Sequence, residues 1–137
     1  MIVLDTNVVS ETLRARPSPG VMQWLESRSE PFALATVTIG ELLTGVRLLP
    51  HGKRHDGLME AVEQVLLRWA VILPYDMEAA RIYAAMREQA QAIGRGLTVE
   101  DGMIAATCAV HGASLATRNM ADFDFLPVPT VNPWEPV

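Results

Sequence analysis

The chain has 137 residues, the length of one ordinary domain, and half of its residues are hydrophobic while a fifth are charged. This composition excludes a disordered tail and a fibrous repeat. The single cysteine, Cys108, excludes an internal disulfide framework and a CxxC zinc or redox site. No apolar run approaches the roughly 20 residues that span a bilayer, and the N-terminal MIVLD lacks the basic region of a signal peptide. We therefore expect a soluble, cytoplasmic protein with no membrane contact.

The charge balance is acidic, with 11 basic residues against 16 acidic ones and a net charge of −5. No overall field therefore draws the chain to nucleic acid, and any such interaction must depend on local patches. A single arginine on such a domain is more commonly a solvated surface residue than a phosphate ligand. The candidate cations are Arg14, Arg16, Arg47, Lys53, Arg54, Arg95 and Arg118.

One strand and two helices are predicted at the start of the chain. Residues 2–5, IVLD, form an apolar β-branched run that ends in a carboxylate, which predicts a short buried strand. Thr6 and Asn7 then offer N-cap chemistry for a helix through about residue 13. Apolar residues at helical spacing predict a second helix over 19–28.

Two strands and two helices are predicted for the middle of the chain. FALA at 32–35 predicts a second strand, and the apolar spacing over 38–49 predicts a helix that stops before a proline. The segment GKRHDG at 52–57 is typical of a turn. Apolar residues recur at helical spacing over 58–69, which predicts a long amphipathic helix, and VIL at 71–73 predicts a third strand.

The last part of the chain holds the most apolar helix. After a helix at 79–93, Thr98 opens a segment whose run MIAATCAV is apolar on almost every side. Such a helix is predicted to lie in the middle of the packing, and Gly112 is suited to end it. The remaining predictions are a fourth strand at 113–117, a turn or short helix at 119–125 and a fifth strand at 130–131.

Strands that alternate with helices predict an α/β fold, in which a parallel sheet of four or five strands is flanked by helices. We find no repeat, linker or low-complexity tract, so we expect one domain. Ligands of such sheets bind beyond the carboxyl ends of the strands. Asp5 and the segment Thr117–Asn119 are predicted to lie there.

Acidic or amide side chains stand at the starts of several predicted elements: Asp5, Glu41, Asp101, and the pair Asn119 and Asp122. Each has a structural explanation. Asp5 is suited to cap a helix, and the segments TIGE and TVED, which end in Glu41 and Asp101, match capping boxes opened by Thr38 and Thr98.

Two of these positions argue for a functional site. Asp5 ends the strand predicted to be central, where a carboxylate is costly unless it is paired or bound to a metal. Asp101 begins the helix predicted to be buried, so its side chain is not expected to face open water. Carboxylates gathered at one crevice repel each other, and a hard cation with oxygen ligands relieves this repulsion.

Other catalytic patterns are absent from the sequence. No GxGxxG follows the first strand and no GxxxxGK[ST] occurs, so a dinucleotide site and a P-loop are unsupported. His51, His55 and His111 share no metal-ligand spacing, and Cys108 inside the apolar helix is predicted to be a core residue.

Five segments, in this order and spacing, resemble the PIN-domain ribonucleases, and among them the VapC/FitB-type toxins of bacterial toxin–antitoxin pairs: IVLDTNVVSE, TIGELLTGV, LTVEDGMIAATCAVHG, LATRNMADF and VNPW. The resemblance covers essentially the whole chain. It therefore implies a single PIN domain over residues 1–137.

The resemblance also implies a metal site. The family's metal-binding carboxylates fall on Asp5, Glu41 and Asp101 of this sequence. The fourth position, which is often Asp in the family, is Asn119 here, and this departure leaves open whether one metal ion is bound or two. Asp122, one turn further on if the segment is helical, is placed to compensate through water.

The implied activity is that of a Mg²⁺- or Mn²⁺-dependent endoribonuclease that hydrolyses RNA phosphodiester bonds. Thr6 and Asn7 are expected to position the carboxylates, and Arg14, Arg47 and Arg118 are candidate RNA contacts. The implied assembly is a homodimer held inactive by a cognate antitoxin in a toxin–antitoxin hetero-oligomer.

A basic side chain of that antitoxin is expected near Asp5 and Asp101, because it would neutralise the carboxylates. Its tail is expected in a groove between the helices at 19–28 and 38–49. Two other functions stay open at this point. One is a PIN-like module that has lost activity and only binds, which Asn119 favours, and the other is an acidic metal site that acts on small phosphoesters.

Overall fold

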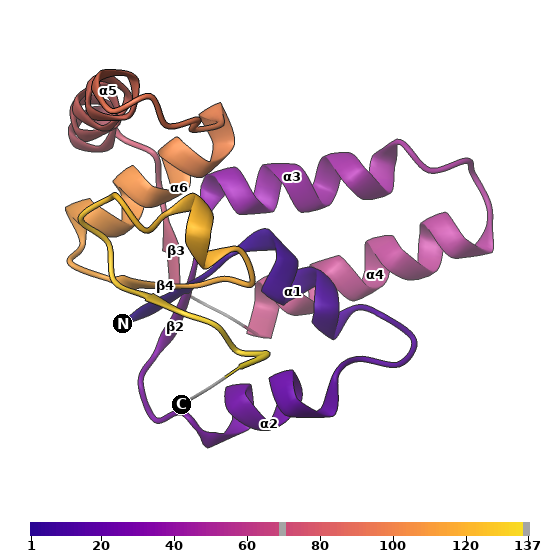
Figure 1. The fold of residues 1–137 in the computed structure, drawn as a ribbon. Helices are drawn as coiled ribbons and strands as arrows, with labels where there is room; N and C mark the ends of the chain where they lie inside the picture. Colours follow the sequence, from indigo (N-terminus) through magenta and orange to yellow (C-terminus); the bar gives the residue numbers. More distant parts are fainter. Residues whose placement is uncertain (69–70, 136–137) are drawn as a thin grey trace.

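The computed structural model describes residues 1–68 and 71–135 (Figure 1). Strands and helices alternate along most of the chain, as predicted. Their bounds are β1 (Ile2–Leu4), α1 (Thr6–Thr12), α2 (Pro19–Ser27), β2 (Phe32–Ala35), α3 (Thr36–Arg47), α4 (Lys53–Arg68), β3 (Val71–Leu73), α5 (Met77–Ala92), α6 (Val99–Val110), β4 (Ser114–Ala116), the 3₁₀ helix η1 (Met120–Asp122) and β5 (Thr130–Val131).

The sheet has five parallel strands in the order β3-β2-β1-β4-β5. The predicted α/β fold and the central place of the first strand are therefore confirmed. In the register, Ile2 lies opposite both Phe32 and Ser114, and Leu4 lies opposite Ala116. The carboxyl ends of β1 and β4 consequently meet at one edge, which brings Asp5 beside Thr117.

Helices cover both faces of the sheet, because successive side chains of a strand point to opposite faces. Val3 belongs to a core formed with α5 and α6, whereas Ile2 and Leu4 belong to a second core formed with α1, α2, α3 and α4. Figure 1 shows α5 and α6 on one side of the strands and α1, α2 and α4 on the other. None of the described helices is long and apolar enough to cross a membrane.

The most apolar helix, α6, lies in the packing as predicted. Ile104, Ala105 and Cys108 are all buried. Thr98 is the N-cap, and its hydroxyl accepts a hydrogen bond from the Asp101 N–H at 3.2 Å. Gly112 follows the helix with φ +58°, a left-handed conformation that glycine adopts without steric cost.

The start of α3 differs from the prediction, and that of α1 agrees with one of two predictions. Asp5, which the sequence also offers as a cap, is the N-cap of α1, rather than Thr6 or Asn7. Helix α3 begins at Thr36 with Ala35 as an N-cap that makes no side-chain bond, so Thr38 does not open a capping box. Thr38 is buried inside the first turn, and its hydroxyl has no partner within the described part of the chain. Burial of this junction, rather than a polar cap, places the start of α3.

The segment 52–57 is not a turn, because α4 begins at Lys53. Only the short connection at 48–52 separates α3 from α4. The charged residues that suggested a turn, Lys53, Arg54 and Asp56, are exposed side chains in the first turns of α4. The described part of α4 ends at Arg68, and residue 69, which the prediction included, lies outside the described residues.

Candidate functional site

Asp5 lies at the carboxyl end of the central strand with only 5% of its surface exposed. Its Oδ1 accepts a hydrogen bond from the Thr6 N–H at 2.8 Å, and this bond caps the N-terminus of α1. Its Oδ2 accepts from the Thr117 hydroxyl at 2.8 Å and from the Asn7 side-chain amide at 3.3 Å. Asp5 therefore has a fixed orientation and is held by three donors, none of them a cation.

Asn7 and Thr117 link the ends of β1 and β4 around this carboxylate. The Asn7 amide also donates to the Thr117 hydroxyl at 3.3 Å, and its Oδ1 accepts from the backbone N–H of Arg118 at 3.2 Å. The Thr117 oxygen also accepts from the Asn119 N–H at 3.1 Å. Sequence reasoning placed Thr117 at this edge without giving it a role. The signal was its place one residue after β4, opposite Asp5 in a parallel register.

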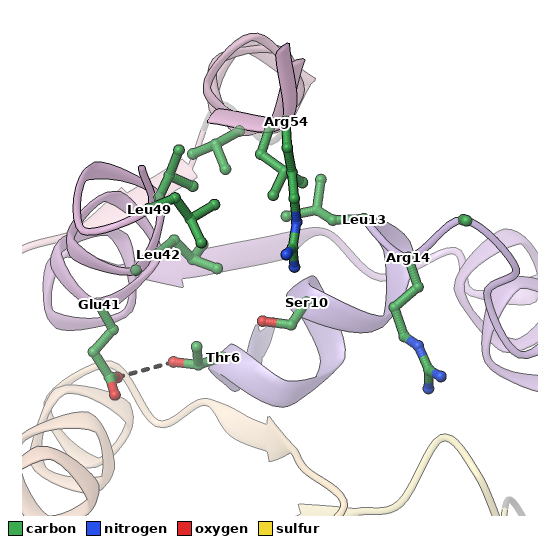
Figure 2. A pocket seen from close by; sticks show the side chains of 13 residues that line it. Thr6, Ser10, Leu13, Arg14, Glu41, Leu42, Leu49 and Arg54 are labelled. Carbon is green, nitrogen blue, oxygen red and sulfur yellow. Dashed lines mark hydrogen bonds between the residues drawn. The ribbon is translucent and has the colours of Figure 1, made fainter. Parts of the chain in front are cut away.

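Glu41 comes to the same edge from α3. The Thr6 hydroxyl donates a hydrogen bond to Glu41 Oε1 at 2.9 Å (Figure 2). The first residue of α1 thus holds a carboxylate that is 35 positions away in the sequence. Glu41 is exposed, so water has access to its carboxylate.

Asp101 reaches the site from the first turn of α6 and is partly buried. Burial raises the pKa of Asp101, and the nearby charge of Asp5 raises it further, against a hydrogen bond with Thr98 that lowers it. The charges of Asp122 and Glu41 add smaller increases to the same pKa. Asp101 therefore lies within electrostatic reach of all three other carboxylates.

The pKa of Asp5 is also raised. Burial is the largest cause, and the hydrogen bonds from Thr117, Thr6 and Asn7 oppose it by stabilising the charged form. The charge of Asp122 raises it as well. Burial and the neighbouring negative charge of Asp122 therefore both disfavour the charged form of Asp5.

Asn119 and Asp122 lie on the segment that follows β4. Asn119 precedes η1, and its side chain is exposed, while Asp122 ends η1. The Asp122 N–H donates to the Asn119 carbonyl at 3.0 Å, so the two residues form one turn. The charge of Asp122 raises the pKa of both Asp5 and Asp101, so Asp122 belongs to the electrostatic surroundings of the site.

The donor set suits a hydrated hard cation rather than a closed metal cage. Among the described residues, no Lys, Arg or His pairs with any of the four carboxylates. No three His, Cys, Asp or Glu side chains of residues 1–68 and 71–135 converge closely enough to hold a metal ion by themselves. Mg²⁺ typically keeps several waters and binds through one or two carboxylates. Asp5 and Asp101 fit that requirement, because both are partly desolvated and neither is paired with a basic side chain in residues 1–68 and 71–135.

The arginines predicted to contact RNA are not gathered at the carboxylates. The Arg14 guanidinium bonds Glu11 Oε1 at 3.3 Å, and Arg47 is exposed in the last turn of α3. The guanidinium of Arg118 stacks over the Trp134 ring at 5.0 Å. Of the three, Arg118 is tied to the site through its backbone bond to Asn7.

A cavity of about 720 Å³ opens between α1, α3 and α4, beside Thr6 and Glu41 (Figure 2). Its wall is mostly apolar and includes Leu42 and Leu58, and Arg54 reaches into it in Figure 2. Of the two helices predicted to form the antitoxin groove, at 19–28 and 38–49, α3 lines this cavity and α2 does not. Helices α1 and α4 complete the lining, and the position of the antitoxin tail stays a prediction.

A family model described as the PIN domain matches residues 2–125. The chain belongs to the PIN domain family. It is 42% identical to toxin FitB of Neisseria gonorrhoeae, with 98% of this chain and 99% of that protein covered. It is 38% identical to VapC ribonuclease Y4jK of Sinorhizobium fredii, with 99% of both covered. The crystal structure of FitAcB from Neisseria gonorrhoeae superposes with a TM-score of 0.91 at 42% identity, over 98% of this chain and 99% of that one.

Proposed function

We propose that this PIN domain is a divalent-metal-dependent endoribonuclease and the toxin of a toxin–antitoxin pair. The observation that carries the proposal is a set of carboxylates from four separate segments at one edge of the sheet, none of them paired with a basic side chain among the described residues. The similarity to a VapC ribonuclease and to toxin FitB supports both the reaction and the role.

Asp5 and Asp101 are proposed as direct ligands of one Mg²⁺ or Mn²⁺ ion, both of which favour oxygen ligands and retain waters. A bound cation would lower the pKa of the water that it coordinates and would neutralise the negative charge that develops on the phosphate in the transition state. Glu41, held by Thr6, orients the attacking water or completes the ligand set. Asn119 contributes a neutral amide where a further carboxylate would add charge.

The antitoxin is proposed to block the site with an Arg or Lys side chain at Asp5 and Asp101, since a charge-assisted hydrogen bond to these carboxylates competes with the metal. Its chain is then expected to lie in the cavity between α1, α3 and α4, next to Glu41. The assembly proposed is a homodimer joined with antitoxin in a hetero-oligomer. The RNA is proposed to contact Arg14, Arg47 and Arg118.

The proposal is tested by offering the purified protein three substrates in Mg²⁺: a single-stranded RNA, a DNA of the same sequence and p-nitrophenyl phosphate. We expect internal cleavage of the RNA and no hydrolysis of the small phosphoester. Hydrolysis of the small phosphoester alone would identify a phosphatase-type site. A protein that binds RNA but leaves it intact in both Mg²⁺ and Mn²⁺ would be an inactive binding module.

A further inference from the structure

The segment from Arg118 to Val128 has little regular structure of its own. Its only helix is the three-residue η1, and its backbone bonds between Asn119 and Phe123 are local. Phe123 is buried, but Asn119 and Asp122 on the same segment are exposed. The position of these two polar residues relative to α6 therefore depends on contacts from outside the segment.

Arg95 supplies such contacts from the connection between α5 and α6. Its Nη2 donates to the Ala121 carbonyl at 2.8 Å and to Asp124 Oδ1 at 2.8 Å. Its guanidinium also lies over the Phe125 ring, 4.6 Å from the centroid. All three contacts are with residues 121–125, so one side chain holds both η1 and the turn that follows it.

The backbone around Arg95 is itself fixed. The Arg95 N–H donates to the Ala90 carbonyl at 2.9 Å, and Gly94 takes the left-handed φ of +70° that this helix ending requires. The Arg87 side chain donates to the Leu97 carbonyl from α5. Thr98, the N-cap of α6, follows directly. Arg95 therefore lies in the connection between α5 and α6, shortly before the first turn of α6 that carries Asp101.

We propose that Arg95 is a positioning residue of the metal site, which fixes the turn carrying Asn119 and Asp122 against the start of α6, where Asp101 lies. The inference rests on the proposed function. Arg95 itself touches neither metal nor RNA, and it acts through the Ala121 carbonyl, the residue next to Asp122.

Because the ion pair between Arg95 and Asp124 is exposed, the effect of Arg95 on the position of the turn can be measured separately from its effect on the stability of the protein. The side chains of Arg95 and Asp124 are 41% and 57% exposed. An exposed ion pair contributes little to folding, so the loss of Arg95 should leave the core of the protein folded. The same loss should free the 119–124 turn, because the Ala121 carbonyl then has no side-chain donor.

The test compares Mn²⁺ binding by the parent with Arg95→Ala, Arg95→Lys, Asp122→Asn and the double variant Arg95→Ala/Asp122→Asn. Asp124→Asn is the matched control, since it removes the ion pair and keeps the bond from Arg95 to Ala121. Mn²⁺ affinity is read from titration calorimetry and from the metal-induced rise in Tm. Amide hydrogen exchange of residues 119–124 in metal-free protein gives a readout independent of the metal and of activity.

We expect Arg95→Ala to weaken Mn²⁺ binding about tenfold, the lower end of the effect of residues that orient metal ligands. Arg95→Lys should recover part of the affinity, Asp124→Asn should stay near the parent, and Arg95→Ala should add little to Asp122→Asn. Exchange at 119–124 should speed up in Arg95→Ala. The inference would be overturned if Arg95→Ala bound Mn²⁺ as tightly as the parent and exchanged the amides of 119–124 at the parent's rate. It would also be overturned if Arg95→Ala still weakened Mn²⁺ binding tenfold when added to Asp122→Asn. A parent that binds no Mn²⁺ would instead overturn the proposed function.

Discussion

Asp5 serves both as the N-cap of α1 and as the most buried of the four site carboxylates. The two roles depend on the same geometry, because the N-cap position turns the carboxylate toward Thr6 and away from solvent. The Thr117 hydroxyl then holds the second oxygen. A residue can therefore satisfy a capping pattern and still belong to a functional site, so the capping pattern does not argue against the site.

For Asp101 in α6, the substitution Asp101→Ala distinguishes a role in helix capping from a role in metal binding. The cap of this helix is the Thr98 hydroxyl bonded to the Asp101 backbone N–H, which the variant keeps. We expect the metal-free variant to be as stable as the parent or more so, because like-charge repulsion with Asp5 is removed. It should lose both RNA cleavage and the Mn²⁺-induced rise in Tm. Thermal melts with and without Mn²⁺ and one cleavage assay check this.

Asn119→Ala is the comparison for that variant and should weaken both metal effects less, since an amide brings no charge to the cation. An Asp101→Ala protein that keeps both RNA cleavage and the Mn²⁺-induced rise in Tm would exclude Asp101 from the metal site.

The raised pKa values give a pH dependence in metal-free protein. Asp5 and Asp101 each have a folded-state pKa above the ordinary value of 3.8, so the folded state holds these protons more tightly than the unfolded state. Their contribution to stability is therefore present below that ordinary value and is lost as pH rises through the folded-state pKa. In EDTA, the free energy of unfolding of Asp101→Asn minus that of the parent should increase from pH 4 to pH 7. A difference that shrinks with pH in denaturant titrations would contradict the sign.

At the scale of the element, α6 depends on a close approach to α5 at Gly102. A Cβ on Gly102 would lie 2.7 Å from Cε2 of Tyr83 and 3.3 Å from Cδ2 of Leu97. Overpacking of this kind costs about 1–3 kcal/mol, which exceeds the gain of about 1 kcal/mol in helix propensity when Gly becomes Ala. We expect Gly102→Ala to lower the free energy of unfolding, measured by urea denaturation. Because Gly102 follows Asp101, Mn²⁺ binding should weaken as well.

Gly57→Ala in α4 is the matched control, because nothing lies within 4 Å of a Cβ at that position. It should raise the stability by roughly 0.5–1 kcal/mol. If Gly102→Ala were as stable as Gly57→Ala, the close approach of α5 and α6 would not require a glycine at position 102.

The elements that the sequence predicts best are those whose signals are local. The apolar spacing lies within α5 and α6, the glycines that end them follow within a few residues, and the structure places both helices as predicted. The start of α3 has no such signal, since Ala35 makes no side-chain cap and Thr38 is buried. The bond between Thr117 and Asp5 joins residues 112 positions apart. Only the strand register brings them together, so a local pattern could not assign Thr117 its partner.

At the scale of the whole molecule, the apolar cavity beside the acidic edge predicts where antitoxin binding is sensitive. Leu58 lines the cavity, whereas Leu67 on the same helix is 75% exposed. We expect Leu58→Glu to weaken binding of the cognate antitoxin by more than about 2 kcal/mol, as loss of a buried apolar contact at an interface can. Leu67→Glu should bind like the parent. Calorimetric titration with the antitoxin checks both, and the reverse order of effects would place the antitoxin elsewhere.

The acidic edge also predicts how the activity of the whole protein responds to metal. No basic side chain in the described part of the chain pairs with the four site carboxylates, and under the proposed function a cation that binds only the folded state would stabilise it and enable cleavage. The most direct measurement follows cleavage of a single-stranded RNA through one cycle of metal removal by EDTA and re-addition of Mg²⁺ or Mn²⁺, for the parent and for Asp5→Asn. Cleavage by the parent should stop in EDTA and return with the metal, while Asp5→Asn should stay inactive throughout. Undiminished cleavage by the parent after thorough chelation, or equal cleavage by Asp5→Asn, would contradict the metal-dependent site.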